Sequence, residues 1–199
     1  MRRDFLRIFA SRGECRMKGK IILISGPCGS GKTTVCRLLA QHSEAVGAVH
    51  MHTDDFYSYI KKGYIEPWKE GSGDQNDTVI RAAAASARSY AEGEYEVYVD
   101  GVVGPWFIDI WKETAALGVD VRYVILRPGL DETVRRGLER EARAEFPLTE
   151  QVFRDMWRMF SNLHEYEKYV INTESQTSEE TAAILKEQIN AGAFCLNVK

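Results

Sequence analysis

The sequence predicts an α/β fold, in which helices cover both faces of a parallel sheet to give three layers. Apolar runs of strand length alternate along the chain with segments of helical periodicity, which is typical of parallel strands joined by crossover helices. A glycine-rich run lies between the first apolar run and the first helical segment. With 199 residues and 44% hydrophobic content, the chain can fill one core. We therefore expect a single domain built on a five-stranded parallel sheet.

Each element of this fold has a recognisable stretch of sequence. Short apolar runs predict strands near Ile21–Ser25, Val46–His52, Tyr95–Asp100, Val121–Leu126 and Tyr169–Asn172. Helical patterns predict helices over Lys32–Ser43, Asp77–Ala91, Phe107–Ala116, Leu130–Glu145, Thr149–Leu163 and Ser178–Ala191. The stretch Tyr57–Asn76 has neither periodicity and is rich in glycine, aromatic and charged residues. We expect this stretch to determine substrate specificity rather than to fill the core.

A phosphate-binding loop is predicted directly after the first strand. Its glycines let successive backbone N–H groups turn inward around an anion, and the following helix adds the positive end of its dipole. Lys32 supplies a point charge for the β- and γ-phosphates, and the Thr33 hydroxyl is placed to bind Mg²⁺. We therefore expect a nucleoside triphosphate as ligand. The residues expected to contact it are Gly26, Pro27, Cys28, Gly29, Ser30, Gly31, Lys32, Thr33 and Thr34.

Charged residues follow three other strands, at the edge where ligands collect in open parallel sheets. Asp54 and Asp55 come after the second strand, where one carboxylate can act as a base; a helix N-terminus is the other interpretation of this pair. Asp100 ends the third strand, and together with Thr33 it is expected to bind Mg²⁺. Arg127 ends the fourth strand, where its cation can meet a phosphate or a nucleobase.

A helical lid is predicted near residues 128–148. Arg136, Arg140 and Arg143 recur at helical spacing and so share one face, from which they can reach over the triphosphate. A solvated helix face, paired with neighbouring glutamates such as Glu139, explains the same pattern. Both interpretations stay open for the group, and Arg136 and Arg140 are the preferred catalytic candidates.

The composition favours a small substrate over a polymer. The net charge of -3 gives no basic footprint for nucleic acid, and no stretch approaches the roughly twenty apolar residues of a membrane-spanning helix. Residues 1–17 are expected to form an N-terminal extension, disordered or helical, and residues 18–199 the domain itself. The expected partner is a small-molecule acceptor, with no nucleic acid and no membrane, and the chain is expected to be a monomer or a homodimer.

The cysteines have no spacing typical of a metal centre, and the histidines are not preferred catalytic residues. Cys15, Cys28, Cys36 and Cys195 have neither metal-ligand spacing nor a disulfide framework, so we expect reduced thiols and a cytoplasmic protein. Oxidation of Cys28 would block nucleotide binding, although a filling role in the loop is the simpler interpretation. His50 and His52 lie in the second strand, where we expect one of them to be buried and hydrogen-bonded. Neither is a preferred catalytic residue.

Four pieces of the chain together resemble the small P-loop kinases. These pieces are Gly26–Thr33, the pair Asp54 and Asp55, the segment Asp100–Trp106, and the stretch Arg127–Arg140. The resemblance spans about residues 18–173 and is strongest to the gluconate kinase-like, shikimate kinase-like and chloramphenicol phosphotransferase-like branch, which includes AAA-type ATP-binding proteins and cytidylate kinase-like proteins. It implies a P-loop nucleoside triphosphate hydrolase fold with strand order 2-3-1-4-5, a mobile lid, and ATP with Mg²⁺. It also implies that Asp54 is the base.

Departures from related families leave the acceptor open. Polynucleotide kinase-like proteins carry an arginine soon after the acidic pair, where this chain has Phe56 and Tyr57, which disfavours a nucleic-acid end as substrate. Uridine kinase-like enzymes share an Asp-Phe-Tyr element, which would make Asp55 the base. A cytidylate kinase would need polar groups to read the base, and the candidates are Gln75 and Asn76. The residues that we expect to contact the acceptor are Asp55, Tyr57, Trp68, Gln75 and Trp106.

These features predict a kinase that transfers the γ-phosphoryl group of ATP to a hydroxyl, or to a phosphate, of a small metabolite. The expected catalytic residues are Lys32, Asp54, Arg136 and Arg140. A nucleotide-hydrolysing switch or regulatory ATP-binding protein is the alternative, although the Asn-Lys-x-Asp motif that reads guanine is absent from the sequence. Release of ADP that no acceptor stimulates would favour this alternative.

Overall fold

The computed structural model describes residues 19–142 and 147–196. The expected N-terminal extension, Arg143 and the end of the expected lid helix therefore lie outside the described residues. The strands are β1 (Lys20–Ser25), β2 (Ala48–His52), β3 (Glu96–Asp100), β4 (Asp120–Leu126) and β5 (Val170–Ile171). The α-helices are α1 (Lys32–Gln41), α2 (Thr53–Ser58), α3 (Gly73–Glu92), α4 (Ile108–Ala116), α5 (Leu130–Glu141), α6 (Glu150–Met159) and α7 (Ser178–Asn190). Two 3₁₀ helices are η2 (Pro105–Phe107) and η3 (His164–Tyr169).

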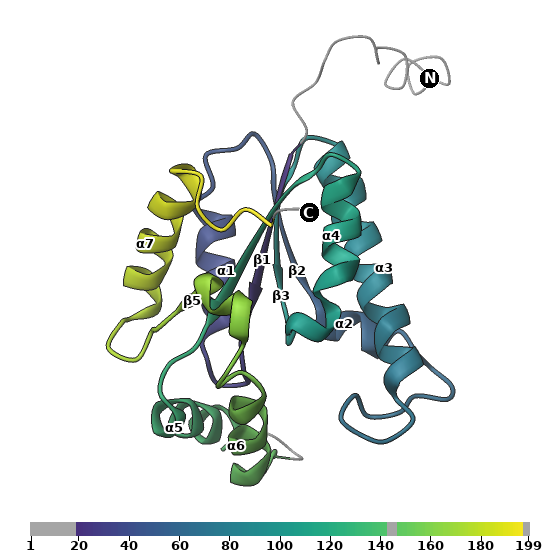
Figure 1. Cartoon of the computed structure of the whole chain (residues 1–199), viewed down its shortest axis with the longest axis vertical. Coiled ribbons are helices and arrows are strands. Elements are labelled where there is room, and N and C mark those ends of the chain that lie inside the picture. Colours follow the sequence, from purple (N-terminus) through teal and green to yellow (C-terminus); the bar gives the residue numbers. More distant parts are fainter. Residues whose placement is uncertain (1–18, 143–146, 197–199) are drawn as a thin grey trace, which may run out of the picture.

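The strands form one sheet in the order β2-β3-β1-β4-β5, and each neighbouring pair is parallel. Figure 1 shows the sheet nearly edge-on, with α1 and α7 on one face and α3 and α4 on the other. The five-stranded sheet, the three layers and the strand order are thus confirmed. Helices α2, α5 and α6 lie at the lower end of this view, where the strands end. Among the described helices, none is long and apolar enough to cross a bilayer.

Two hydrophobic cores lie on the two faces of the sheet, and β1 contributes to both. Ile21 and Leu23 belong to the core on the side of α3 and α4, whereas Ile22 and Ile24 belong to the core on the side of α1 and α7. All four side chains are completely buried. A strand buried on both faces gives a continuous apolar run, which is why this strand was plain in the sequence.

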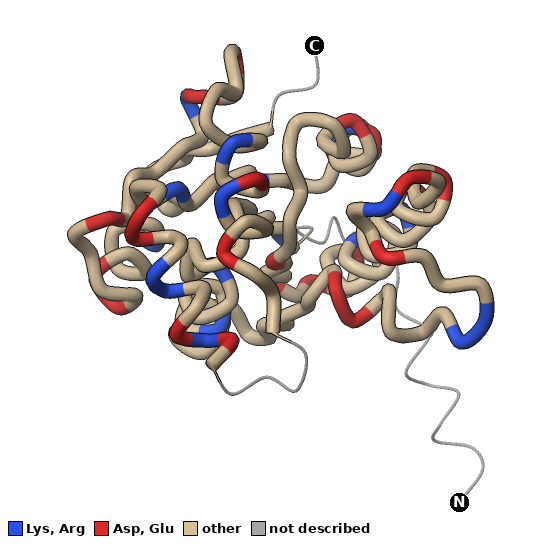
Figure 2. Tube along the Cα trace, turned by 90° about the horizontal axis from the view of Figure 1, so that it is seen from below, with Lys and Arg blue, Asp and Glu red and all other residues tan. Residues whose placement is uncertain are grey.

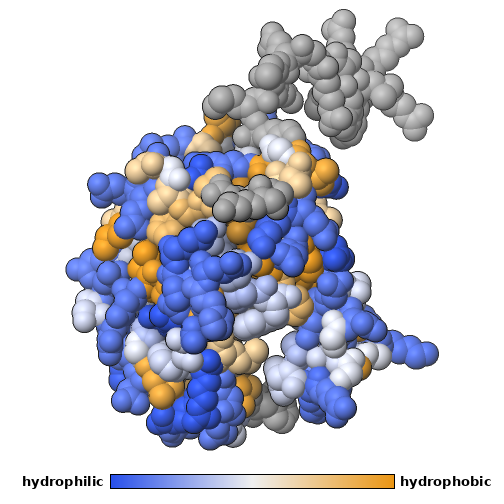
Figure 3. All heavy atoms as spheres, in the orientation of Figure 1, coloured by the Kyte–Doolittle hydropathy of each residue, from blue (hydrophilic) through white to orange (hydrophobic). Residues whose placement is uncertain are grey.

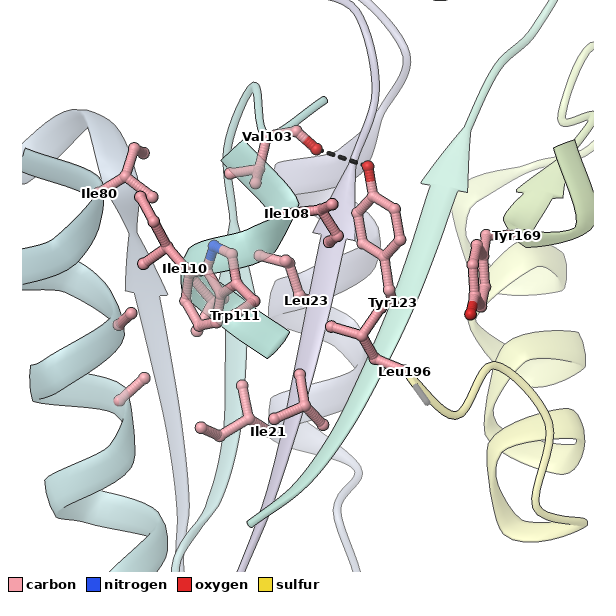
Figure 4. Close-up of a cluster of buried hydrophobic side chains, with 14 of the residues drawn as sticks. Ile21, Leu23, Ile80, Val103, Ile108, Ile110, Trp111, Tyr123, Tyr169 and Leu196 are labelled. Atoms are coloured by element: carbon pink, nitrogen blue, oxygen red, sulfur yellow. Dashed lines mark hydrogen bonds between the residues drawn. The ribbon is translucent and has the colours of Figure 1, made fainter. Parts of the chain in front are cut away.

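The larger core fixes the loop that follows β3. Figure 4 shows Trp111 and Ile108 of α4 packed beside Leu23 and Tyr123 of the sheet. The Tyr123 hydroxyl donates a hydrogen bond of 2.6 Å to the carbonyl oxygen of Val103. Core packing therefore extends to the carboxyl ends of the strands.

Further contacts hold these strand ends together. The Ser25 hydroxyl donates to the Val103 carbonyl at 2.8 Å and accepts from the Val103 N–H at 3.0 Å. A Cβ at Gly101 would lie 1.9 Å from Thr53 Oγ1, so the absence of a side chain there lets α2 begin against the end of β3. The first turn of α2 consequently lies next to Asp100.

Prediction and structure differ most between β2 and α3. The stretch 57–76 was expected to be irregular, but α2 runs to Ser58 and α3 begins at Gly73. Six residues are too few to show helical periodicity, so the sequence pattern did not predict α2. Its acidic first turn, formed by Asp54 and Asp55, is the signal that a helix begins there, because carboxylates are stabilised near a helix N-terminus.

Candidate functional site

The loop between β1 and α1 has the backbone geometry of an anion cradle. Gly29 and Gly31 have φ angles of 86° and 88°, in the left-handed region that favours glycine. A Cβ at Gly29 would lie 2.3 Å from the Thr133 carbonyl oxygen, so α5 packs directly against the loop. Gly31 is the N-cap of α1, and no described side chain caps this helix. Its first backbone N–H groups therefore remain available for a phosphate.

Lys32 lies at the start of α1 and turns back over the loop. Its side chain is almost fully buried, and Nζ donates to the Pro27 carbonyl oxygen at 3.4 Å. The hydroxyl of Ser30 is buried and has no hydrogen-bond partner among the described residues. An ammonium group and free backbone donors thus face the same small region, as phosphate binding requires.

The two predicted magnesium ligands meet at the end of the sheet. Thr33 Oγ1 donates to Asp100 Oδ2 at 2.6 Å, while the other oxygen of this carboxylate lies 2.7 Å from His50 Nε2 and 3.0 Å from His52 Nδ1. Burial alone would raise the pKa of Asp100, but the hydrogen bonds from His50 and Thr33 lower it below its ordinary value. Asp100 is therefore a buried, ionised carboxylate, and both histidines face it.

A cavity of about 670 Å³ opens beside the phosphate loop. It is lined by residues of 29–35, by α5 and by residues of 173–181. Arg136 crosses this cavity, since its Nε donates to Glu132 at 2.6 Å and its Nη2 donates to the Thr173 carbonyl at 3.3 Å. The hydroxyl of Thr173 is buried without a partner among the described residues. Loop, lid helix and the entry to α7 therefore enclose one space large enough for a nucleotide.

The second lid arginine lies on the same cavity, and both arginines also pair with acids. Arg140 donates from Nε and Nη2 to Glu141 at 2.9 and 2.8 Å. Burial works against its charge, but the hydrogen bonds to Glu141 raise the pKa of Arg140. The structure thus combines the two interpretations of this helix face, because the arginines face the loop and are held by glutamates of their own lid.

The acidic pair lies in the first turn of α2. Asp54 and Asp55 are both exposed, and neither makes a hydrogen bond through its carboxylate to another described side chain. The helix begins directly after His52, which pairs in register with Asp100 across the sheet. Burial, followed by the charge of Asp54, raises the pKa of Tyr57 to about 12. α2 begins at Thr53, which lies against Gly101, and its first turn carries both carboxylates; the choice between them stays open.

Arg127 lies in a different environment from the one expected. Its guanidinium donates two hydrogen bonds to Glu167, at 2.9 and 2.8 Å, and one to the Phe160 carbonyl at 2.7 Å. These bonds fix η3 and the end of α6 to the end of β4. The structure therefore explains Arg127 by packing, and its contact with the nucleotide stays a prediction.

Gln75 is likewise occupied by the backbone of its own region. Its amide accepts from the Ile65 N–H at 2.9 Å and donates to the Ile65 carbonyl at 2.6 Å. The neighbouring Asn76 amide donates to the Pro67 carbonyl at 2.8 Å. Both side chains hold the segment 59–72 against the first turn of α3. Recognition of an acceptor by Gln75 stays a prediction.

The tryptophans predicted to contact the acceptor are exposed and come from different parts of the chain. Trp106 is 44% exposed and packs edge to face on Phe160 at a centroid distance of 5.4 Å, whereas Trp68 is 60% exposed. A cavity of about 430 Å³ between α2 and α3 includes Gln75 and Phe56 in its lining. Figure 3 shows the surface hollowed at the lower end of the molecule, between the α5–α6 side and the α2–α3 side. Figure 2, seen from that end, shows Lys and Arg interspersed with Asp and Glu along the described chain.

Comparison with known proteins identifies the family. A family model described as an AAA domain matches residues 22–147, which is more than half of the chain. The chain belongs to this AAA domain family. The match begins in β1 and includes the phosphate loop, Asp100 and both lid arginines. No curated protein matches this AAA domain chain.

Solved structures of kinases share the fold of this AAA domain protein. The APS kinase of Mycobacterium tuberculosis, in complex with AMPPNP and APS, has a TM-score of 0.66 and 18% identity, covering 88% of this chain and 99% of the other. The shikimate kinase of Acinetobacter baumannii, in complex with shikimate, has a TM-score of 0.59 and 21% identity, with coverages of 89% and 96%. A gluconokinase of Sinorhizobium meliloti has a TM-score of 0.60 and 18% identity, with coverages of 89% and 99%. The suspected small P-loop kinase branch is confirmed, and the likeness shows a kinase-like fold.

The sequence patterns did not indicate that His50 and His52 contact Asp100, or that the loop after β5 lines the cavity. His50 and His52 are two positions apart in a strand, so period-two alternation places both on one face, and the pairing of β2 with β3 brings them beside Asp100. The cavity-lining residues Thr173 and Gln176 follow the short strand β5. They carry no motif, because a loop that contacts a ligand needs only suitable backbone and small polar side chains.

Proposed function

We propose that this protein is an ATP-dependent kinase that transfers the γ-phosphoryl group to a hydroxyl, or to a phosphate, of a small metabolite. The contact of 2.6 Å between Thr33 Oγ1 and Asp100 Oδ2 carries this proposal. It brings together two oxygen ligands from different elements, next to the buried Lys32 and the uncapped start of α1. The kinase-like fold supports transfer over simple binding.

Thr33 and Asp100 fit Mg²⁺, because both offer hard oxygen atoms and the carboxylate is ionised. When bound with ATP, Mg²⁺ neutralises charge on the phosphate oxygens. Backbone N–H groups of the loop orient the β-phosphate, and Lys32 offsets charge on the transferred group. Arg136 and Arg140 reach the same cavity from the lid helix and add positive charge there. Positioning and neutralisation are the main tasks of a protein in phosphoryl transfer.

Asp54 is the proposed base that accepts the proton of the acceptor hydroxyl. It is exposed in the first turn of α2, and its charge acts on the half-buried Tyr57. Asp55 lies in the same turn and is the competing candidate. The proposed acceptor contacts are Asp55 and Tyr57 of α2, Trp68 of the segment 59–72, Gln75 of α3 and Trp106 of η2.

Acceptor-dependent release of ADP tests the proposal. Sugars, sugar acids, nucleosides, nucleotides and aminocyclitols are supplied singly with ATP and Mg²⁺, and one class is expected to stimulate ADP release. With that acceptor, Asp54→Asn is expected to lower kcat by about 10²- to 10⁴-fold, the usual contribution of general base catalysis. Asp131→Asn, an exposed aspartate of α5, is the matched control and is expected to keep normal turnover.

Two results would contradict parts of the proposal. Normal turnover of Asp54→Asn together with loss in Asp55→Asn would transfer the role of base to Asp55. ADP release that no acceptor stimulates would contradict the kinase and favour a nucleotide-hydrolysing switch. Lys32→Ala is expected to lose turnover whether the protein is a kinase or a nucleotide-hydrolysing switch. Stimulation of ADP release by an acceptor therefore distinguishes the two functions.

A further inference from the structure

A cluster of four ligand-type side chains lies behind the predicted magnesium ligands. Cys36 comes from α1, His50 and His52 from β2, and Asp100 from the end of β3. Ligand atoms of Cys36, His50 and Asp100 all lie within 4.8 Å of one another. His52 Nδ1 adds a fourth group at 3.0 Å from Asp100 Oδ1, and the two imidazole centroids are 4.5 Å apart. Sequence spacing could not reveal the cluster, because its members come from three elements.

Asp100 presents its two oxygens to different surroundings. Oδ2 accepts from Thr33 on the side of the phosphate loop, whereas Oδ1 faces both histidines. The loop side offers only oxygen ligands, which suit Mg²⁺. The other side offers sulfur and nitrogen as well, which suit softer divalent cations.

We propose that Cys36, His50, Asp100 and His52 form a second metal site, selective for Zn²⁺ or a similar soft divalent cation. The set of one thiolate, one carboxylate and imidazole nitrogens is a common zinc donor set. Ligands that one zinc ion holds at about 2.0 to 2.3 Å lie at most about 4.6 Å from one another. The ligand atoms of Cys36, His50 and Asp100, all within 4.8 Å of one another, are already close to that range. On binding, the thiol proton of Cys36 is released to solvent, and His50 binds through Nε2 with its remaining proton on Nδ1.

Burial and access both agree with such a site. Cys36 is completely buried and Asp100 nearly so, which shields the donors from competing water. The side chains of His50 and His52 are 19% and 35% exposed, so they provide the entry path.

Zinc at this position would connect directly to the phosphate loop. It would withdraw Oδ1 of Asp100 from the two histidines and reorient the carboxylate that holds Thr33. This consequence depends on the proposed kinase function, but binding of the metal itself does not. The experiment therefore measures binding first, on nucleotide-free protein without Mg²⁺.

Cobalt(II) is the spectroscopic probe, because a thiolate ligand gives it a charge-transfer absorption band in the near ultraviolet. The full chain is titrated with Co²⁺, and one equivalent is expected to produce this band. Excess Mg²⁺ is expected to leave it, and Zn²⁺ is expected to abolish it by displacement. Cys36→Ala is expected to lose the band, whereas Cys195→Ala, which removes an exposed free thiol, is expected to keep it. Absence of the band in the unmodified chain, or its persistence in Cys36→Ala, would overturn the proposal.

A second variant covers the case in which Cys36→Ala fails to fold. His50→Gln removes a partly exposed ligand, and we expect the affinity for Zn²⁺, measured by calorimetry, to fall at least tenfold. His164→Gln, an exposed histidine of η3, is the matched control with unchanged affinity. Unchanged affinity in His50→Gln would contradict the site even if the protein proves to be a kinase. Conversely, metal binding without any phosphoryl transfer would support the site and contradict only the proposed function.

Discussion

The phosphate loop lines the cavity beside α5, the segment 59–72 contributes to the cavity between α2 and α3, and the two stretches are held in opposite ways. In the phosphate loop, a Cβ at Gly29 would lie 2.3 Å from the backbone of α5. In the segment 59–72, Gly63 and Gly71 also have positive φ, of 78° and 85°, but a Cβ at either would meet nothing within 4 Å. The loop is therefore enclosed by other elements, whereas the segment is exposed and held from one side by Gln75 and Asn76.

This difference separates phosphate binding, which depends on the loop backbone, from acceptor specificity, which depends on side chains. A phosphate is bound by backbone N–H groups, so the loop must keep one conformation, and only certain residues allow it. The segment 59–72 meets solvent on its outer side, so many sequences satisfy its packing. We expect the proposed acceptor specificity to reside there, because side chains can change without disturbing the sheet.

Among substitutions in these two stretches, removal of the loop lysine should have the largest effect. We expect Lys32→Ala to reduce kcat by about 10²- to 10³-fold, because a preorganised charge next to the transferred group is lost. Stability should change little, since Nζ makes one long hydrogen bond, of 3.4 Å, within its own loop. Steady-state kinetics and a thermal melt check the two parts. Lys186→Ala is the control, because Lys186 lies in the second half of α7 and pairs with groups outside the cavity beside α5, among them Glu44. Turnover within threefold of normal would contradict the role given to Lys32.

A pair of glycine substitutions tests directly whether the phosphate loop is more tightly enclosed than the segment 59–72. Gly29→Ala and Gly71→Ala introduce the same strain at φ of 86° and 85°, but only Gly29→Ala places a methyl group against backbone. We expect unfolding free energies to fall by about 3 kcal/mol for Gly29→Ala and about 1 kcal/mol for Gly71→Ala. Nucleotide affinity should be lost with the first and kept with the second. Urea unfolding and nucleotide titration measure both quantities, and equal losses would show that the two stretches are enclosed alike.

The same difference explains how far the sequence could predict the molecule. β1 was predicted within one residue because it is buried on both faces, and Lys32 and Thr33 follow from the loop pattern. Strand order came from a family resemblance, because periodicity alone does not determine which strands pair. Contact of Arg127 with the nucleotide stays a prediction, and nothing in the sequence indicated that Glu167, forty positions later, would pair with it. The partnership of His50 with Asp100 likewise depends on strand pairing, which a single sequence does not display.

Gln75 should affect the acceptor side alone. We expect Gln75→Ala to cost about 1 kcal/mol of stability, because the Ile65 N–H and carbonyl each lose a partner. Loosening of the segment 59–72 should raise the KM for the acceptor several-fold while the KM for ATP stays constant. Gln41→Ala, an exposed glutamine at the end of α1, is the matched control. A change in the KM for ATP alone would show that the segment 59–72 contributes to nucleotide binding, as the phosphate loop does.

Arg127 provides the smallest and most discriminating test, because its residue type predicts nucleotide binding and its contacts predict packing. Arg127→Met should cost about 1 kcal/mol at pH 7, the upper range for a partly exposed ion pair. The hydrogen bonds from Arg127 chiefly hold the pKa of Glu167 below its usual value of 4.5. A carboxylate with a lowered pKa stabilises the fold above its ordinary pKa and loses that contribution as the pH falls through the folded value. The difference between the variant and the unmodified protein should therefore shrink as the pH is lowered from 7 to below about 4. Urea unfolding across this range measures the stability difference, with Arg154→Met as the control on α6.

Nucleotide affinity of Arg127→Met should stay unchanged, because two bonds to Glu167 and one to Phe160 occupy the guanidinium. A tenfold loss of nucleotide affinity with no pH-dependent stability difference would instead assign Arg127 to the nucleotide and extend the enclosed half of the site to the end of β4.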